Sequence, residues 1–184
     1  MVGLVFGAHF CSYTYITPFL LHDASFGMST ITWLLLGFGV IGFFSNFAVS
    51  STVDRSIKAS VATMVSLMMF ALLSMPLLRH SQLAVTVDVF AWGISFGALP
   101  LCFSVWIQRA TPDLPEAGSA LFVSIIQVAI AVGSLVGGTI VDSVGIPPDF
   151  LLGSALALLG LAALASFGRS AVAHADRDCL ATPE

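Results

Sequence analysis

Long apolar stretches alternate with short polar breaks along the 184-residue chain. Each stretch is near the roughly 20 residues that a helix needs to cross the hydrocarbon core of a bilayer. Polar and apolar residues do not alternate within the stretches, as they would in the strands of a membrane barrel. The pattern predicts an all-α integral membrane protein with six transmembrane helices, at about residues 2–21, 30–50, 59–78, 83–107, 119–141 and 150–168. Residues 169–184 are expected to form a disordered cytoplasmic tail.

The first apolar stretch carries a polar stripe, formed by His9, Ser12, Tyr13 and Thr17. These residues recur at spacings of three and four, so a helix would place them on one face. Unpaired polar groups facing lipid cost several kcal/mol each. We therefore expect the stripe to face other protein or a water-filled cavity.

The first and fourth stretches each contain a proline near one end, Pro18 and Pro100, together with glycines. Proline removes a backbone donor and kinks a helix. Interrupted helices in matching positions of two repeats are typical of a transport pathway; an ordinary packing kink is the alternative for either proline alone. A faint echo between SSTVD (50–54) and GGTIVD (137–142) also favours an inverted repeat of three plus three helices.

The fifth stretch carries Gly133 and Gly137, four residues apart. Small residues at this spacing let helix backbones approach closely in lipid. We interpret this pair as a packing seam rather than a binding surface.

The breaks between stretches differ in basic residues, which sets the orientation of membrane helices. On one side of the expected bundle lie five of the six Lys and Arg residues, and Arg79 lies on the other. The positive-inside rule then places both termini in the cytoplasm. The five residues are Arg55, Lys58, Arg109, Arg169 and Arg177.

Composition agrees with the pattern. Only 9% of the residues are charged and 58% are hydrophobic, whereas a soluble domain carries roughly 25% charge. The basic residues form no patch of the kind that binds nucleic acid, and the three cysteines lack metal or redox spacing. We expect no cofactor, no metal, no secretory signal peptide and no enzyme activity, because no nucleophile and base or ligand cluster lies in the stretches.

Two titratable side chains lie within apolar stretches and are candidate proton sites. His9 has an ordinary pKa near about 6.5, which suits proton exchange, and Tyr13 four residues later could hydrogen-bond to it or to a solute. Asp88 could bind a proton or reach the outer interface. For His9, a neutral structural histidine remains the alternative.

Further candidates are uncharged. Asn46 and Gln127 are amides that we expect to face the bundle interior, where they would bond across helices or bind a solute. Tyr15, Trp92 and Phe96 could form an aromatic wall for a hydrophobic compound; simple packing is the alternative. Thr17 completes the candidates from the polar stripe.

The segments HFCSYTYITPFL, LLLGFGVIGFFSN and VDR, and a longer segment from WGISFGALP to GGTIVD, carry a family resemblance. Over residues 3–168 the chain resembles the C-terminal half of the major facilitator superfamily, in the arabinose-efflux or sugar-efflux branch of drug:proton antiporters. The resemblance implies that the six helices correspond to the seventh through twelfth of twelve. It also implies that the first and fourth line a central cavity, and that Asp54 and Arg55 act as a gating latch. A solvated loop that only sets the topology is the alternative for this pair.

The chain departs from the family pattern at three positions. Ser50 stands where the loop motif usually begins with glycine, and the basic end of that motif is reduced to Lys58. Ser104 stands where a glutamine is frequent. These departures weaken the expected gating and the polar contacts of the fourth helix.

The leading hypothesis is a facilitator-type transporter half in a bacterial inner membrane, exporting a sugar-like or drug-like solute by alternating access, with protons as the coupling ion. Its partners would be the lipid bilayer, the solute and a second six-helix half. The alternative is a truncated or split half that does not transport alone, and serves as an assembly partner or as a homodimer.

Overall fold

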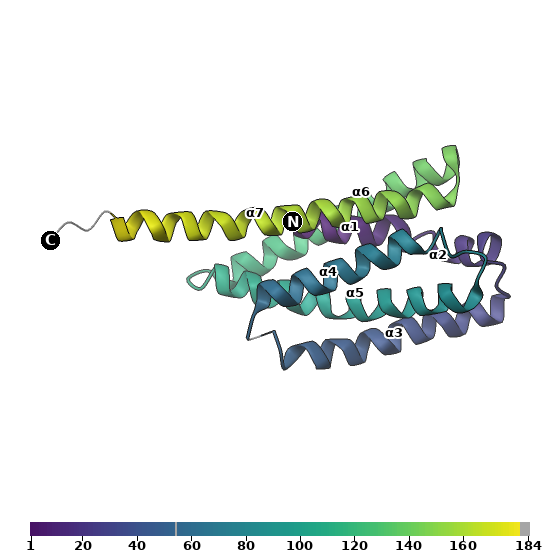
Figure 1. The fold of residues 1–184 in the computed structure, drawn as a ribbon, viewed down its shortest axis with the longest axis horizontal. Coiled ribbons are helices and arrows are strands. Elements are labelled where there is room, and N and C mark those ends of the chain that lie inside the picture. Colours follow the sequence, from purple (N-terminus) through teal and green to yellow (C-terminus); the bar gives the residue numbers. More distant parts are fainter. Residues whose placement is uncertain (54, 181–184) are drawn as a thin grey trace.

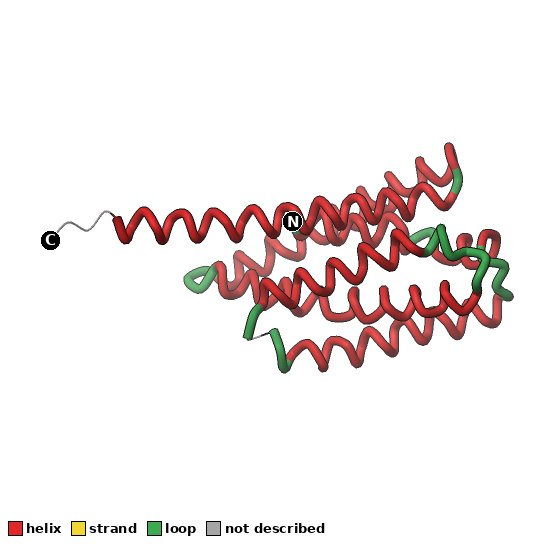
Figure 2. The backbone as a smooth tube through the Cα atoms, viewed as in Figure 1, coloured by secondary structure: helices red, strands yellow, loops and turns green. Residues whose placement is uncertain are grey.

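The computed structural model describes the backbone of residues 1–53 and 55–180, and the side chains as far as Ser166. Within these ranges every regular element is helical, and the helices lie alongside one another as a bundle (Figure 1, Figure 2). The elements are α1 (Val2–Tyr13), α2 (Ile16–Pro18), the π-helical turn η1 (Phe19–Asp23), α3 (Met28–Ser50), α4 (Ile57–Ser74), α5 (Gln82–Ala110), α6 (Pro115–Val144) and α7 (Ile146–Leu180).

The protein is an all-α integral membrane protein. Among the described residues, five helices are long and apolar enough to cross a membrane, and the first segment becomes a sixth when its two bent parts are counted as one span. α7 continues past residue 168, the predicted end of the last span, to Leu180. The disorder predicted for the tail stays a prediction, because its side chains lie outside the described range.

The first span is broken, with a bend of 42° between Val2–Tyr13 and Ile16–Asp23. The break lies at Thr14 and Tyr15, and Tyr15 leaves the helical region with φ −110° and ψ 11°. A proline removes the N–H that would bond to the carbonyl four residues earlier and clashes with that carbonyl. For Pro18 this carbonyl belongs to Thr14, so the break falls one turn before the proline. By contrast, α5 passes through Pro100 as one helix, and the expected interruption there is absent.

The packing of the helices follows an inverted repeat. α1 packs against α6 and α7, α5 packs against α3 and α4, and α4 packs against α7. Exchanging the first span with α5, α3 with α6 and α4 with α7 reproduces the same set of pairs. Successive spans are antiparallel and related spans are three positions apart in the chain, so the two repeats run in opposite directions.

Glycines bring both symmetry-related helix pairs into close contact. A Cβ atom at Gly133 of α6 would come 2.8 Å from the backbone oxygen of Gly7 in α1. A Cβ atom at Gly42 of α3 would come 3.1 Å from the backbone oxygen of Gly93 in α5, and one at Gly97 would meet the backbone of Gly42. Backbones this close exclude larger side chains, as expected for helices that associate in lipid.

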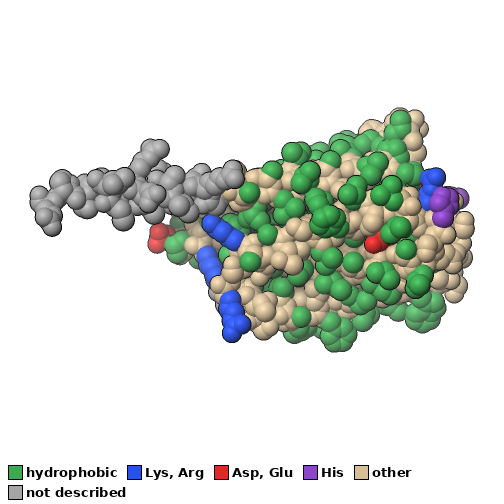
Figure 3. All heavy atoms as spheres, viewed as in Figure 1, with side chains coloured by type: hydrophobic (Ala, Val, Ile, Leu, Met, Phe, Trp, Pro, Cys, Tyr) green, Lys and Arg blue, Asp and Glu red, His purple; other side chains and the backbone are tan. Residues whose placement is uncertain are grey.

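On the face shown in Figure 3, Lys, Arg and His side chains lie at the two ends of the bundle, and the flank between them is hydrophobic or uncharged apart from one acidic side chain. Arg55, Lys58 and Arg109 lie in or beside the loops at one end. At the other end, Arg79 forms an ion pair of 3.9 Å with Asp23. Asp54, the other half of the predicted gating pair, lies outside the described residues, and Arg55 is exposed.

Candidate functional site

His9 lies at the centre of an aromatic cluster between α1, α3 and α5. Its side chain is 1% exposed, and the indole Nε1 of Trp92 donates a hydrogen bond of 3.1 Å to its Nδ1. An indole N–H can only donate, so Nδ1 accepts and the imidazole is neutral with its proton on Nε2. Protonating Nδ1 would break this bond. His9 is therefore held as an acceptor in this conformation, which favours the structural alternative over the proton site.

The rest of this cluster consists of rings stacked around His9. The Phe96 ring lies parallel to the imidazole with centroids 3.3 Å apart, and the Tyr13 ring stacks on it at 4.9 Å. Tyr13 therefore contacts His9 by stacking, and the hydrogen bond to the imidazole comes from Trp92 instead. Tyr13 and Phe96 are only half-buried. We define the aromatic cluster as His9, Phe10, Tyr13, Phe38, Trp92 and Phe96.

A groove of about 330 Å³ runs beside the aromatic cluster between α3 and α5. Phe38 and Phe96 belong both to the aromatic cluster and to the lining of this groove. Asn46 lies in the groove, where its Nδ2 donates a hydrogen bond of 3.1 Å to the Gly97 carbonyl, and its amide oxygen has no donor among the described residues. We call this the α3–α5 groove; its lining residues are Phe38, Gly39, Gly42, Phe43, Asn46, Gly93, Phe96 and Gly97.

Only part of the predicted aromatic wall comes together. Trp92 and Phe96 meet at His9, but Tyr15 packs on α6, where its hydroxyl donates a hydrogen bond of 3.1 Å to the Ser134 carbonyl. Gln127 is exposed on α6. Of the two predicted amides, Asn46 is half-buried and bonds to α5, whereas Gln127 does not pack inside this bundle.

The polar stripe does not face a single neighbour, and the break in the first span separates only Thr17 from the other three residues. His9 and Tyr13 face α5, whereas the Ser12 hydroxyl donates a hydrogen bond of 3.4 Å to the Asp149 backbone carbonyl in α7. Thr17 lies beyond the break in α2 and is half-buried. The spacing rule groups residues on one broad face, which here contacts both α5 and α7, and it assumes an unbroken helix as far as Thr17.

The two intramembrane carboxyl groups have different surroundings. Asp88 is half-buried, and its Oδ2 accepts a hydrogen bond of 2.9 Å from the Ser74 hydroxyl of α4. Asp149 is fully buried, and the sequence reasoning missed it by reading IPPD as a loop. Gly145, with φ 95°, ends α6, and α7 then begins with Pro147 and Pro148 in its first turn. Proline is common at the start of a helix, and this signal could have placed Asp149 inside the span.

The surroundings of Asp149 are unusually poor in donors. Its Oδ1 accepts a hydrogen bond of 2.8 Å from the Cys11 thiol, and its Oδ2 is buried without a hydrogen-bond partner. Gly137 of α6 lies against it, because a Cβ there would come 2.9 Å from Oδ1. Gly133 and Gly137 thus form the close contact with α1, and Gly137 also leaves room for the carboxyl group.

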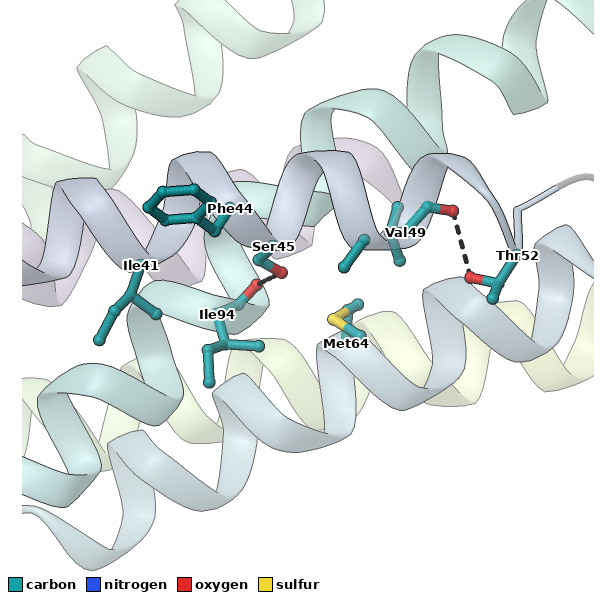
Figure 4. Close-up of a pocket in the computed structure, with 8 residues that line it drawn as sticks. Ile41, Phe44, Ser45, Val49, Thr52, Met64 and Ile94 are labelled. Atoms are coloured by element: carbon teal, nitrogen blue, oxygen red, sulfur yellow. Dashed lines mark hydrogen bonds between the residues drawn. The ribbon is translucent and has the colours of Figure 1, made fainter.

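A larger groove, of about 480 Å³, lies between α3 and α4 (Figure 4). Its lining is apolar apart from two hydroxyls. Ser45 donates to the Ile94 carbonyl at 2.6 Å, and Thr52 donates to the Val49 carbonyl at 3.1 Å. Small-molecule sites need a few free polar groups for orientation, and this groove offers fewer of them than the α3–α5 groove.

No protein-family model matches this chain. It is homologous to curated proteins named purine ribonucleoside efflux pump NepI, from Escherichia coli strain K12 and from Shigella flexneri. In both, the identity is 30% over 164 residues, which cover 86% of this chain and 41% of the relative. The chain thus spans about two fifths of the length of these relatives. They are named as transport proteins, in agreement with the prediction that this chain is not an enzyme.

Proposed function

We propose that this chain is the C-terminal six-helix half of a major facilitator transporter that exports a small solute with a planar ring, such as a purine ribonucleoside. The observation that carries the proposal is the stack of half-buried rings next to a groove with a free amide oxygen. Planar bases stack on aromatic side chains with a gain of about 1–3 kcal/mol per base. The name of the homologous pumps supports the same class of solute.

The size of the α3–α5 groove agrees with this class. At about 330 Å³ it lies at the lower end of the roughly 300–1,000 Å³ found for small-molecule sites. The Asn46 amide oxygen can accept a hydrogen bond from an exocyclic amine or a ribose hydroxyl. Tyr13 and Phe96 offer the ring faces.

The groove is open on one side, so a single six-helix bundle gives only one wall of a closed site. A second six-helix half would supply the other wall and allow alternating access. The proposed setting is a bacterial inner membrane with both termini in the cytoplasm, in line with the basic residues near one end of the bundle.

The test is export of radiolabelled purine ribonucleosides by proteoliposomes that hold the chain together with its N-terminal half, under an imposed pH gradient. Wild-type protein should export the label, Asn46→Ala should lose most of the flux, and Gln127→Ala, a matched change of an exposed amide, should keep it. No flux from the paired wild-type protein would contradict the proposal. Equal loss of flux in both variants would mean that the α3–α5 groove is not the solute site.

A second proposal is that the chain does not transport alone and acts as an assembly partner, either for a separate half or for a second copy. The open groove and the greater length of the matched relatives favour it. Native mass spectrometry from a membrane extract should detect a two-chain species. Substrate flux from liposomes that contain only single copies would contradict this second proposal.

A further inference from the structure

Among the described residues, Asp149 is the one with a buried side-chain polar atom that lacks a hydrogen-bond partner. It is 0% exposed, one oxygen contacts a thiol, and the other has no hydrogen-bond partner. Among the described residues no Lys or Arg forms an ion pair with it. An ionised carboxylate in such a site is far more costly than a neutral acid, because a thiol is a weak donor and burial removes water.

The titratable groups around Asp149 come from each neighbouring element. α1 contributes the Cys11 thiol, and the break after it contributes the Tyr15 phenol. α6 contributes the carboxyl group of Asp142, which is exposed. η1 packs the Phe19 ring on Phe150; its own ionisable groups lie at the end of the bundle, where Asp23 pairs with Arg79. α4, which also packs on α7, has Lys58 as its only ionisable side chain, at the opposite end of the helix. None of these groups supplies a positive charge beside Asp149.

We propose that the Asp149 carboxyl is the proton-binding site of this transporter half, protonated in the conformation described here. The proton sits on Oδ2, and the Cys11 thiol donates to Oδ1. This inference rests on the proposed function for its role in transport, but its chemistry can be tested without transport.

The position of Asp149 connects the proton to the bend in the first span. Cys11 and Ser12, which contact its side chain and its carbonyl, lie just before the break at Thr14 and Tyr15. When α1 moves away from α7, water reaches Oδ2, the O–H bond breaks and the proton passes to water. The first turn of α7 then stabilises the carboxylate through the positive end of the helix dipole. For α1 to pack against α7 again, the Asp149 carboxylate must first take up a proton.

The direct test is infrared spectroscopy of the purified, lipid-reconstituted chain paired with its N-terminal half. A protonated carboxyl gives a C=O stretching band above the amide bands, and this band shifts in D₂O. We expect the band at neutral pH in wild-type protein and in Asp88→Asn, and its loss in Asp149→Asn. In Cys11→Ala it should move to higher frequency, because the donor to Oδ1 is gone.

The outcomes separate the two proposals. If wild-type protein lacks the band, or the band persists in a folded Asp149→Asn variant, the proton site is wrong. If Asp149→Asn does not fold, an unshifted band in Cys11→Ala overturns the proposal instead. With the site correct, a folded Asp149→Asn variant should keep downhill solute exchange and lose at least tenfold in flux driven by a pH gradient. Absence of all wild-type flux alongside an intact band would overturn the proposed function and leave the proton site standing.

Discussion

The close contact of α6 with α1 predicts a clear difference between two glycine substitutions. At Gly133 an added Cβ would lie 2.8 Å from the Gly7 oxygen and 3.2 Å from the Gly7 Cα atom. Both are backbone atoms, so Gly133→Ala must displace one helix from the other. At Gly7 itself an added Cβ meets nothing within 4 Å. Gly7→Ala is therefore a control on the opposite side of the same contact.

The magnitude follows from two opposing effects. Overpacking a tight contact costs about 1–3 kcal/mol, and replacing glycine by alanine inside a helix stabilises it by up to about 1 kcal/mol. Gly133→Ala should therefore lower the free energy of unfolding by about 0–3 kcal/mol, and Gly7→Ala should leave it unchanged or raise it. The two variants should differ by about 1–3 kcal/mol, which is the overpacking cost alone.

The assay is reversible unfolding in mixed micelles with increasing SDS, followed by tryptophan fluorescence, with both variants measured against wild type. The reasoning is refuted if Gly133→Ala is as stable as Gly7→Ala. That result would mean that α1 and α6 are not held at backbone contact.

Three further predictions use the same unfolding assay. Trp92→Phe should destabilise the protein by about 1–3 kcal/mol, since it leaves the buried Nδ1 of His9 without a donor; a change below that range would contradict the bond. Gly42→Ala should destabilise, whereas Gly39→Ala, where nothing lies within 4 Å, should not; equal stability would argue against the α3–α5 contact. Arg79→Gln should change stability by less than about 1 kcal/mol, because its pair with Asp23 is partly exposed; a larger loss would indicate an unrecognised role for that end of the bundle.

Much of the fold is readable from the sequence because lipid imposes simple rules on length and polarity. The six spans follow from hydropathy, and the echo between SSTVD (50–54) and GGTIVD (137–142) indicated the inverted repeat. The break at Thr14 is harder to place, because a proline acts on a carbonyl four residues earlier. For the same reason the polar stripe could not be followed past Tyr13.

The candidate site was less predictable, because residue type does not reveal a partner. Asn46 and Gln127 are both amides in spans, yet one bonds across helices and the other is exposed. His9 has the chemistry of a proton carrier, but Trp92 makes it an acceptor. Asp149 was missed because a hydropathy pattern treats a carboxylate next to two prolines as a loop.

The central claim is that the face bearing Tyr13 and Asn46 is turned toward a second bundle and water, and the face bearing Phe44 toward lipid. Spin labels at these three positions, in a cysteine-free background of the chain paired with the proposed N-terminal half, test it directly. Collisions with a water-soluble nickel chelate should dominate at positions 13 and 46, and collisions with oxygen should dominate at position 44. Lipid-like accessibility at positions 13 and 46 would contradict the transporter interpretation.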